Sequence, residues 1–228
     1  MQIVNCNLED CFLCQSCIPE WKQVIALRKR TIVVKKGKQI FKEGDPVTGI
    51  YFMYSGSAKV YKQWVNQKEL IIRFVKPGDI LGHRGIGDSN IYPIGATALE
   101  DSKACFIPND FLEATLKTNP TFTYKLMHFY ADELQKAEKR MRNLAHMEVK
   151  GRIAEALLEI SKISGLTKDK FIALTVSRQD IASYAGTTYE TVFKFLTELS
   201  KTKIISTAGK NIKINNMEKL KQYILKHS

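Results

Sequence analysis

The chain has 228 residues, of which 44% are hydrophobic and 25% charged, and its formal net charge at pH 7 is +12. This composition is typical of a folded protein with one large or two modest domains, and it excludes a wholly disordered chain. No apolar run reaches the length of about 18 residues that crosses a bilayer, and no secretory signal opens the chain, so we expect a cytoplasmic protein without membrane partners.

The first segment, "VNCNLEDCFLCQSCIPEW", holds four of the five cysteines. An odd number of cysteines in a cytoplasmic chain argues against a disulfide framework and for metal, redox or inert roles. Thiolates are soft ligands for iron and zinc, and four of them close a tetrahedral or cubane site. Intervals of two residues separate Cys11, Cys14 and Cys17, as in bacterial ferredoxins, and the remote Cys105 can complete such a set.

The region from Thr31 to Pro108 is predicted to be rich in short strands. Turn residues such as Gly37, Gly56 and Pro77-Gly78 separate the runs, and this regular spacing predicts a β-barrel, roll or sandwich. The predicted strands are "TIVVKK", "IYFMYSG", "SAKVYKQW", "ELIIRFV", "IGATALE" and "KACFIP".

Helical periodicity begins after Asn119-Pro120 and continues for nearly thirty residues, a length of roughly 40 Å. Apolar residues alternate spacings of three and four, which indicates a seam along one helix face. The helix could pack on its own β-domain, but a small roll can hardly cover this length, so we favour a two-helix dimer seam. The predicted seam residues are Met127, Tyr130, Leu134, Ala137, Met141 and Leu144.

A helix, a tight turn and a second helix are predicted within "SRQDIASYAGTTYETVFKFLTELSKTKII". Ser177 is a plausible N-cap, Gly186 interrupts the pattern, and Thr187 with Glu190 resembles a capping box that starts the second helix. This is the helix-turn-helix unit. Its predicted inner faces are Ile181, Ala182 and Ala185, then Val192, Phe195, Leu196 and Leu199.

A helix, "GRIAEALLEISKIS", and a short strand, "FIALTV", precede this unit, and a hairpin with Lys210 at its tip follows it as a wing. Residues 150–228 contain 14 Lys and Arg against 7 Asp and Glu, which suits a polyanionic partner. In the docking geometry of this unit, the start of the second helix enters the major groove. The candidate DNA-binding residues are Thr188, Tyr189, Glu190, Phe193 and Lys194 for bases, and Arg178, Gln179, Lys201 and Lys210 for phosphates. Two of them have structural alternatives, because Glu190 can serve the capping box alone and Phe193 can pack under the wing.

The order of β-roll, long helix and winged helix-turn-helix resembles the Crp/Fnr family of bacterial transcription regulators over essentially the whole chain. The matching stretches are "FKEGDPVTGIYFMYSGSAKVY", "VKPGDILG" and "SRQDIASYAGTTYETVFKFLTEL". The resemblance implies an α+β fold: a cyclic-nucleotide-binding-like β-roll (a double-stranded jelly roll) with a Cys-rich tail at 1–119, a dimerisation helix at 120–148 and a winged helix-turn-helix at 149–228. It further implies a homodimer on a pseudo-palindromic operator in double-stranded DNA, with RNA polymerase as a partner.

Members of the family that bind cyclic AMP carry Gly-Glu-Leu and a later arginine that pairs with the cyclic phosphate. Here the first stretch is Gly78-Asp79-Ile80, and Pro93-Ile94 replaces the arginine and hydroxyl. Burying a phosphate without that arginine would be costly, so we expect no cyclic AMP binding. Arg84 is the candidate replacement.

The stretch that ends in "KACFIP" looks more like the oxygen-sensing Fnr branch, which holds a [4Fe–4S] cluster on three N-terminal cysteines and a fourth before Ile-Pro. The resemblance therefore implies a cluster on Cys11, Cys14, Cys17 and Cys105. Other sets stay open: Cys6 with Cys11, Cys14 and Cys105, or the four N-terminal cysteines alone. Zinc is less favoured by the short intervals, and without a metal Cys105 would be a small core residue.

An enzyme is not expected. His83, His128, His146 and His227 are scattered without a metal-ligand spacing, and no Gly-x-Ser-x-Gly or phosphate-binding loop occurs. A cyclic-nucleotide-binding module without DNA activity is a further alternative, which the wing and Pro93 disfavour. The main alternative is the same regulator with another small-molecule or protein input and no cluster.

Overall fold

The computed structural model describes residues 11–65 and 68–225, so Cys6 lies outside the described residues. The chain forms two compact units. The first consists of Met1–Gln63 and Val75–Gln135, and the second of Trp64–Phe74 and Lys136–Ser228. Within the described part of the chain, no helix is long and apolar enough to cross a membrane.

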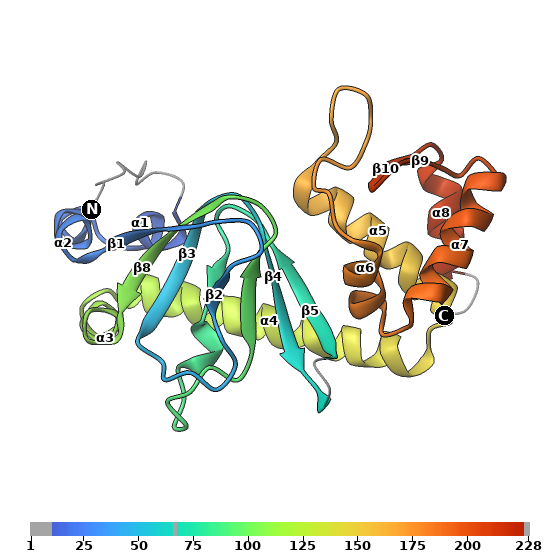
Figure 1. The fold of residues 1–228 in the computed structure, drawn as a ribbon. Helices are drawn as coiled ribbons and strands as arrows, with labels where there is room; N and C mark the ends of the chain where they lie inside the picture. Colours follow the sequence, from blue (N-terminus) through green and yellow to red (C-terminus); the bar gives the residue numbers. More distant parts are fainter. Residues whose placement is uncertain (1–10, 66–67, 226–228) are drawn as a thin grey trace. The chain divides into compact units, whose positions relative to one another are not determined.

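Two four-stranded sheets make the β-rich region (Figure 1), with the strand orders β1-β8-β3-β6 and β2-β7-β4-β5. The pairs β1–β8, β3–β8, β3–β6, β2–β7 and β4–β7 are antiparallel. The strands are β1 (Arg30–Val34), β2 (Gln39–Phe41), β3 (Gly49–Ser55), β4 (Ala58–Gln63), β5 (Glu69–Val75), β6 (Ile80–Leu81), β7 (Gly95–Ala98) and β8 (Ser102–Pro108).

All six strands expected from the sequence are present, and the double-sheet roll is confirmed. The short strands β2 and β6 were not predicted, because two or three residues carry too little alternation to be recognised. The predicted strand "FIALTV" is wrong: this segment makes isolated bridges, in which Phe171 pairs with Lys213 and Ile172 with Leu166. The predicted division at 119 and 148 stays a prediction.

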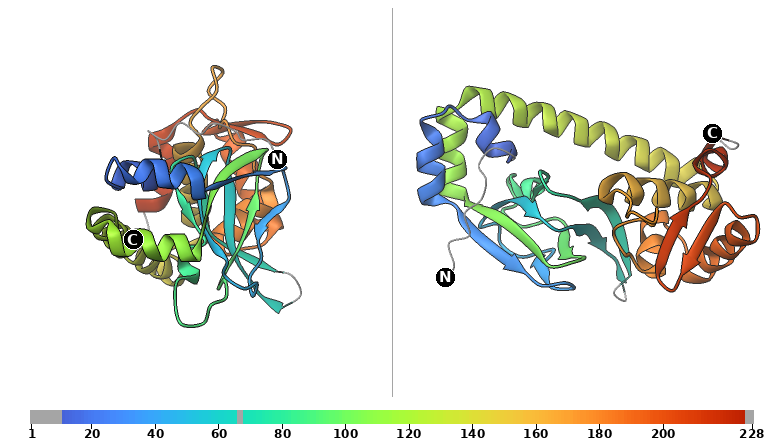
Figure 2. Two further views of the ribbon diagram at one scale, coloured as in Figure 1. Left: turned by 90° about the vertical axis from the view of Figure 1, so that its left-hand side faces the viewer. Right: turned by 90° about the horizontal axis from the view of Figure 1, so that it is seen from above.

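Three helices gather at one end of the roll: α1 (Phe12–Ser16), α2 (Trp21–Arg28) and α3 (Asn109–Thr118). Both views of Figure 2 show α2 and α3 side by side. The Trp21 ring stacks on Phe111 with 5.9 Å between centroids, and Arg28 forms an ion pair with Asp110. The part of the Cys-rich segment from residue 11 onward is therefore packed structure and not a loose tail.

Helix α4 (Pro120–His146) confirms the long helix, with 27 residues in one continuous run. Its early part turns Phe122 and Leu126 into the core of the first unit, where they are 0% and 4% exposed. Glu133 follows on the same face and is also buried. The helix therefore packs on the first unit through this one face, whereas residues on its other faces are exposed to solvent.

The second unit contains the predicted helix-turn-helix and its wing. Helix α5 (Val149–Ser164) precedes α6 (Arg178–Ala185) and α7 (Tyr189–Lys201), and the strands β9 (Ile205–Ala208) and β10 (Asn211–Ile214) form the hairpin before α8 (Met217–Leu225). All seven predicted inner-face residues of α6 and α7 are at most 3% exposed. The pattern of apolar residues thus placed both helices correctly.

Candidate functional site

The turn between α6 and α7 is fixed by local interactions. Ser177 caps α6 in a capping box with Asp180: the Asp180 N–H donates to the Ser177 hydroxyl at 3.0 Å. Gly186 ends α6 with a φ of +60°, in the left-handed region that favours glycine. A Cβ at this position would lie 2.9 Å from Cδ2 of Leu144, at the end of α4.

The predicted capping box of α7 on Thr187 is wrong by one residue. The N-cap is Thr188, whose hydroxyl accepts a hydrogen bond from the N–H of Thr191 at 3.3 Å. Glu190 belongs to the first turn, and its own backbone N–H lowers the pKa of its carboxyl, with smaller contributions from the Thr188 hydroxyl and the Lys194 charge. The sequence offered two adjacent threonines, and the tight turn after Gly186 selects the second.

The outer face of α7 presents the base-reading candidates to solvent. Tyr189 is 44% exposed and Phe193 52%, and their rings stack with 6.4 Å between centroids and 14° between planes. Glu190 and Lys194 are exposed beside them. The alternative in which Phe193 packs under the wing is therefore wrong.

The four phosphate candidates lie at the ends of α6, α7 and the wing. Gln179, Lys201 and Lys210 are exposed, and Lys210 occupies the hairpin tip. Arg178 is only partly exposed, and its guanidinium donates to the carbonyl of Gly209 at 3.1 Å. Arg178 thus joins the start of α6 to the wing tip.

Two arginines that sequence reasoning missed organise the helix-turn-helix from inside. Arg152 of α5 donates to the carbonyls of Met147 at 2.6 Å and Ala185 at 2.8 Å. It thereby ties the residue that follows α4 to the last residue of α6. A cation at these helix ends also complements the negative end of the helix dipole.

Arg140 of α4 has a similar role and connects α4 to α6 and β5. Its guanidinium lies 3.7 Å from the ring centroid of Tyr184 and donates to the carbonyls of Tyr184 and, at 2.9 Å, of Ile71 in β5. Tyr184 in turn stacks on Phe74, with 5.2 Å between centroids. Desolvation lowers the pKa of Arg140, and the neighbouring carbonyls and ring compensate its buried charge.

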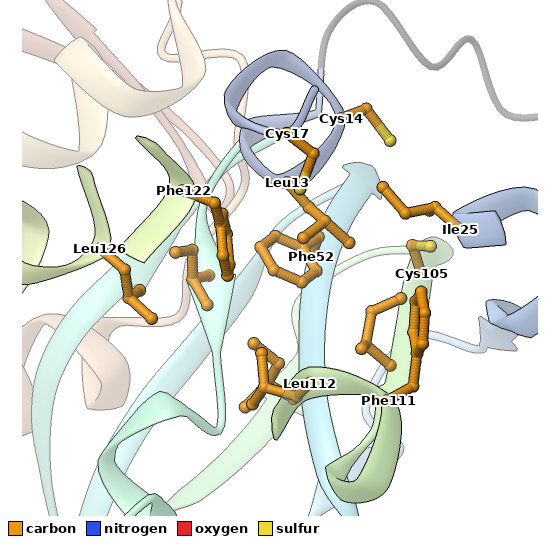
Figure 3. Close-up of a cluster of buried hydrophobic side chains, with 13 residues drawn as sticks. Leu13, Cys14, Cys17, Ile25, Phe52, Cys105, Phe111, Leu112, Phe122 and Leu126 are labelled. Atoms are coloured by element: carbon orange, nitrogen blue, oxygen red, sulfur yellow. The ribbon is translucent and has the colours of Figure 1, made fainter. Parts of the chain in front are cut away.

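Three of the four described cysteines lie in one buried apolar cluster of the first unit (Figure 3), where Cys14, Cys17 and Cys105 are at most 8% exposed. Cys11 packs against its edge, and the structure presents all four as thiols. Cys105 is held in β8 between Thr31 of β1 and Phe52 of β3. The predicted remote ligand thus shares a core with the N-terminal thiols.

The thiols differ in their acidity. A hydrogen bond from the Cys14 thiol lowers the pKa of Cys11 to about 7, against the opposing effect of burial. Burial raises the pKa of Cys17 to about 12, and the Cys11 charge adds to this. At neutral pH the thiol at the start of α1 is therefore the more acidic of the two and is partly ionised, whereas the thiol at its end is neutral.

Cys11 and Cys105 line one cavity of about 240 Å³ together with residues of β3 and the turn of Pro77 and Gly78 between β5 and β6. The number and type of thiols fit an iron–sulfur cluster. Their arrangement is open, however: among residues 11–65 and 68–225 no group of three or more His, Cys, Asp or Glu side chains is close enough to hold a metal ion. Leu13 of α1 is fully buried in the same cluster.

Arg84, the candidate phosphate ligand, lies on a short 3-10 turn, with Nη2 3.7 Å from Oε2 of Glu133 in α4. Glu133 is buried, so it directs this guanidinium toward α4. The adjacent His83 carbonyl accepts a hydrogen bond from the Tyr130 hydroxyl at 2.5 Å. Both contacts tie α4 to the turn after β6.

The predicted seam separates into two groups. Met127, Leu134 and Met141, spaced by seven residues, are 59%, 61% and 61% exposed. Tyr130 packs on its own roll, and Ala137 and Leu144 are partly buried. The three exposed residues form an apolar stripe along α4.

Comparison with known proteins finds a family match in each of the two units. The Cyclic nucleotide-binding domain family matches residues 31–119, and the Crp-like helix-turn-helix domain family matches residues 151–223. The Anaerobic regulatory protein of Pasteurella multocida is 32% identical over 220 residues, which cover 92% of this chain and 80% of the relative. This chain belongs to the Crp/Fnr family.

Two further Crp/Fnr relatives support the assignment. The Fumarate and nitrate reduction regulatory protein of Escherichia coli K12 is 30% identical over 225 residues, covering 95% of this chain and 89% of the relative. The solved structure of FixK2 from Bradyrhizobium japonicum superposes with a TM-score of 0.76 at 27% identity, over 86% of this chain and 96% of FixK2. The protein is a DNA-binding transcription regulator and not an enzyme.

Proposed function

We propose that this Crp/Fnr regulator is a homodimer that binds a pseudo-palindromic operator and responds to oxygen or redox state through a [4Fe–4S] cluster. The observation that carries the proposal is the shared core of Cys14, Cys17 and Cys105, with Cys11 at its edge. Relatives that this chain matches over most of their length are named anaerobic regulatory proteins, which supports the same input.

The exposed stripe of Met127, Leu134 and Met141 supports the homodimer. Apolar side chains at a spacing of seven on a helix of 27 residues suit a two-helix coiled-coil seam. A dimer places one helix-turn-helix on each half-site, so that the operator mirrors the twofold symmetry of the protein.

The outer face of α7 supplies base contacts in this proposal. Lys194 can donate to guanine, and the Glu190 carboxylate can accept from the amino group of cytosine. Gln179, Lys201 and Lys210 are exposed around this face and suit phosphates, which fix the register of the protein on DNA. RNA polymerase is the partner that the family implies.

Cys11, Cys14, Cys17 and Cys105 would hold the cluster. When bound, it supplies an oxygen-sensitive redox centre. Cys105 is fixed by strand pairing on both sides, whereas the other three thiols lie on or beside α1, a helix of five residues. Since the thiols are not assembled, we expect loading to repack α1 while β8 keeps its register.

Protein purified without oxygen tests the proposal by iron, sulfide and zinc analysis. We expect about four iron atoms per chain for [4Fe–4S], and their loss in both Cys105→Ser and Cys105→Ala. Ile107→Val is the matched control, because Ile107 is a fully buried residue of the same strand and carries no ligand atom.

Gel retardation of a palindromic DNA fragment, with and without oxygen, reports on the output. A Cys105→Ala protein that keeps both iron and sulfide would contradict Cys105 as a ligand and point to the four N-terminal cysteines, whereas wild-type protein without iron and sulfide would contradict the cluster itself. In that case DNA binding that persists favours the same regulator with another small-molecule or protein input. Zinc without sulfide would point to a structural thiolate site.

A further inference from the structure

The stacked rings of Tyr189 and Phe193, here called the aromatic pair, form an apolar ledge on the first two turns of α7. They lie one helical turn apart, and about half of each side chain is exposed. Ionic residues flank the ledge, with Glu190 next to Tyr189 and Lys194 next to Phe193. The ledge thus stands alone on an otherwise polar face.

The fold does not need the aromatic pair. Val192, Phe195, Leu196 and Leu199 fill the inner face of α7 and are at most 3% exposed. Two large rings left in water lose the free energy that their burial would give. An occupant from outside the chain is therefore the natural partner for this surface.

The chemistry around the ledge identifies the occupant, and this step rests on the proposed docking of α7 in the major groove. The second unit carries most of the basic surplus, which attracts a polyanion. Among the four bases, thymine alone presents a methyl group in the major groove. We propose that the aromatic pair selects thymine by contacting C5-methyl groups on two base pairs of each half-site that lie about two steps apart.

The dimensions are compatible with two contacts. The ring centroids are 6.4 Å apart, and the rise per base pair is about 3.4 Å, so the aromatic pair extends over roughly two steps of the duplex. Cytosine at the same place lacks the methyl group and presents an amino group to an apolar ring. The flanking Glu190 and Lys194 would then read the neighbouring base pairs.

The test starts from a duplex that purified full-length protein selects from a random-sequence library. Each thymine of that duplex is replaced in turn by uracil, which removes the methyl group and keeps the pairing. We expect dissociation constants to rise roughly fourfold per contacted methyl group and roughly 15-fold when both half-sites are changed. Salt is held constant throughout.

Phe193→Ala should bind the thymine duplex more weakly and lose the discrimination between thymine and uracil at one position per half-site. Trp64→Ala is the matched control, since it removes a ring that is 76% exposed in the hairpin between β4 and β5. Thermal unfolding of Phe193→Ala should match wild type, because the ring is not part of the core.

The outcomes separate this inference from the proposed function. Protein that selects no sequence from the library overturns the operator-binding proposal and the inference together. Protein that selects a sequence but binds its uracil form equally well overturns the inference alone. Discrimination that survives in Phe193→Ala and in Tyr189→Ala also overturns it.

Discussion

Two regions of the molecule use their residues in opposite ways. One is the thiol cluster of the first unit, made of Cys11, Cys14, Cys17 and Cys105. The other is the outer face of α7 in the second unit, here called the reading surface. On α7 the candidate contacts point to solvent, and a separate set of apolar residues makes the core. In the thiol cluster the candidate ligands Cys14, Cys17 and Cys105 are themselves core residues. A substitution on α7 can therefore change function alone, whereas a cysteine substitution changes packing and chemistry together.

The largest effect is expected within the thiol cluster, where the half-buried Cys11 and the buried Cys17 should react with an alkylating reagent at very different rates. In protein without a cluster, iodoacetamide should modify Cys11 with a midpoint near pH 7, whereas Cys17 should stay nearly unreactive. At pH 8 the thiolate fractions differ by roughly 10⁴-fold, and the greater nucleophilicity of the more basic thiolate offsets part of this, so we expect rates that differ by roughly 100-fold or more, measured by mass spectrometry of the modified peptides. Equal rates in the folded protein would contradict the buried environment of Cys17, and urea should abolish the difference.

These pKa shifts also set the sign of the pH dependence of stability. The folded pKa of Cys11 is lowered from 9.0, so its contribution is present above pH 9 and is lost as pH falls through 7. The folded pKa of Cys17 is raised from 9.0, so its contribution is present below pH 9 and is lost as pH rises toward 12. Between pH 7 and 9 the Cys11 contribution should make the cluster-free protein more stable as pH rises.

The second prediction tests whether the reading surface depends on its inner arginine. Arg152→Met removes the hydrogen bonds to Met147 and Ala185 and should lower the free energy of unfolding by about 2–3 kcal/mol, roughly 100-fold in the equilibrium. Urea unfolding measures the loss, and DNA binding should weaken with it. Arg142→Met is the matched control, because this exposed guanidinium donates to the neighbouring Asn143 side chain. Equal stability of the two variants would contradict the role of Arg152.

The smallest expected effect concerns the start of α7. Thr188→Ala removes the cap and should cost about 1 kcal/mol in urea unfolding, whereas Thr187→Ala should cost less than about half of that. The comparison needs no DNA, since it separates two adjacent threonines by stability alone. A larger loss of stability in Thr187→Ala than in Thr188→Ala would instead support the capping box on Thr187 that the sequence predicted.

The two regions also differ in how far the sequence predicted them. Ser177, Gly186 and the inner face of α7 were placed correctly, because caps, turns and helical periodicity act within a few residues. The cap of α7 was missed by one residue, since only the backbone after Gly186 distinguishes Thr187 from Thr188. Local patterns are thus enough to build the reading surface.

Interactions between distant residues could not be predicted in the same way. Arg140 and Arg152 look like ordinary helix-surface cations in the sequence, and only the fold brings them to carbonyls of other elements. Likewise, Cys105 joins the N-terminal thiols through the pairing of β8 with β1 and β3. The sequence identified the thiols, whereas their separation in space depends on how α1 packs.

Gly186 shows how the reading surface is limited in its sequence variation. It is exposed, so solvent accessibility alone would rank it among the most replaceable residues of the unit. Its positive φ nevertheless strains any residue with a side chain, and a Cβ would also require the Leu144 side chain to shift. In a saturation library, selection for folding should keep glycine at 186 while positions 189 and 193 vary freely. New operator preferences can therefore arise on α7 only as long as a residue without a side chain keeps the turn in place.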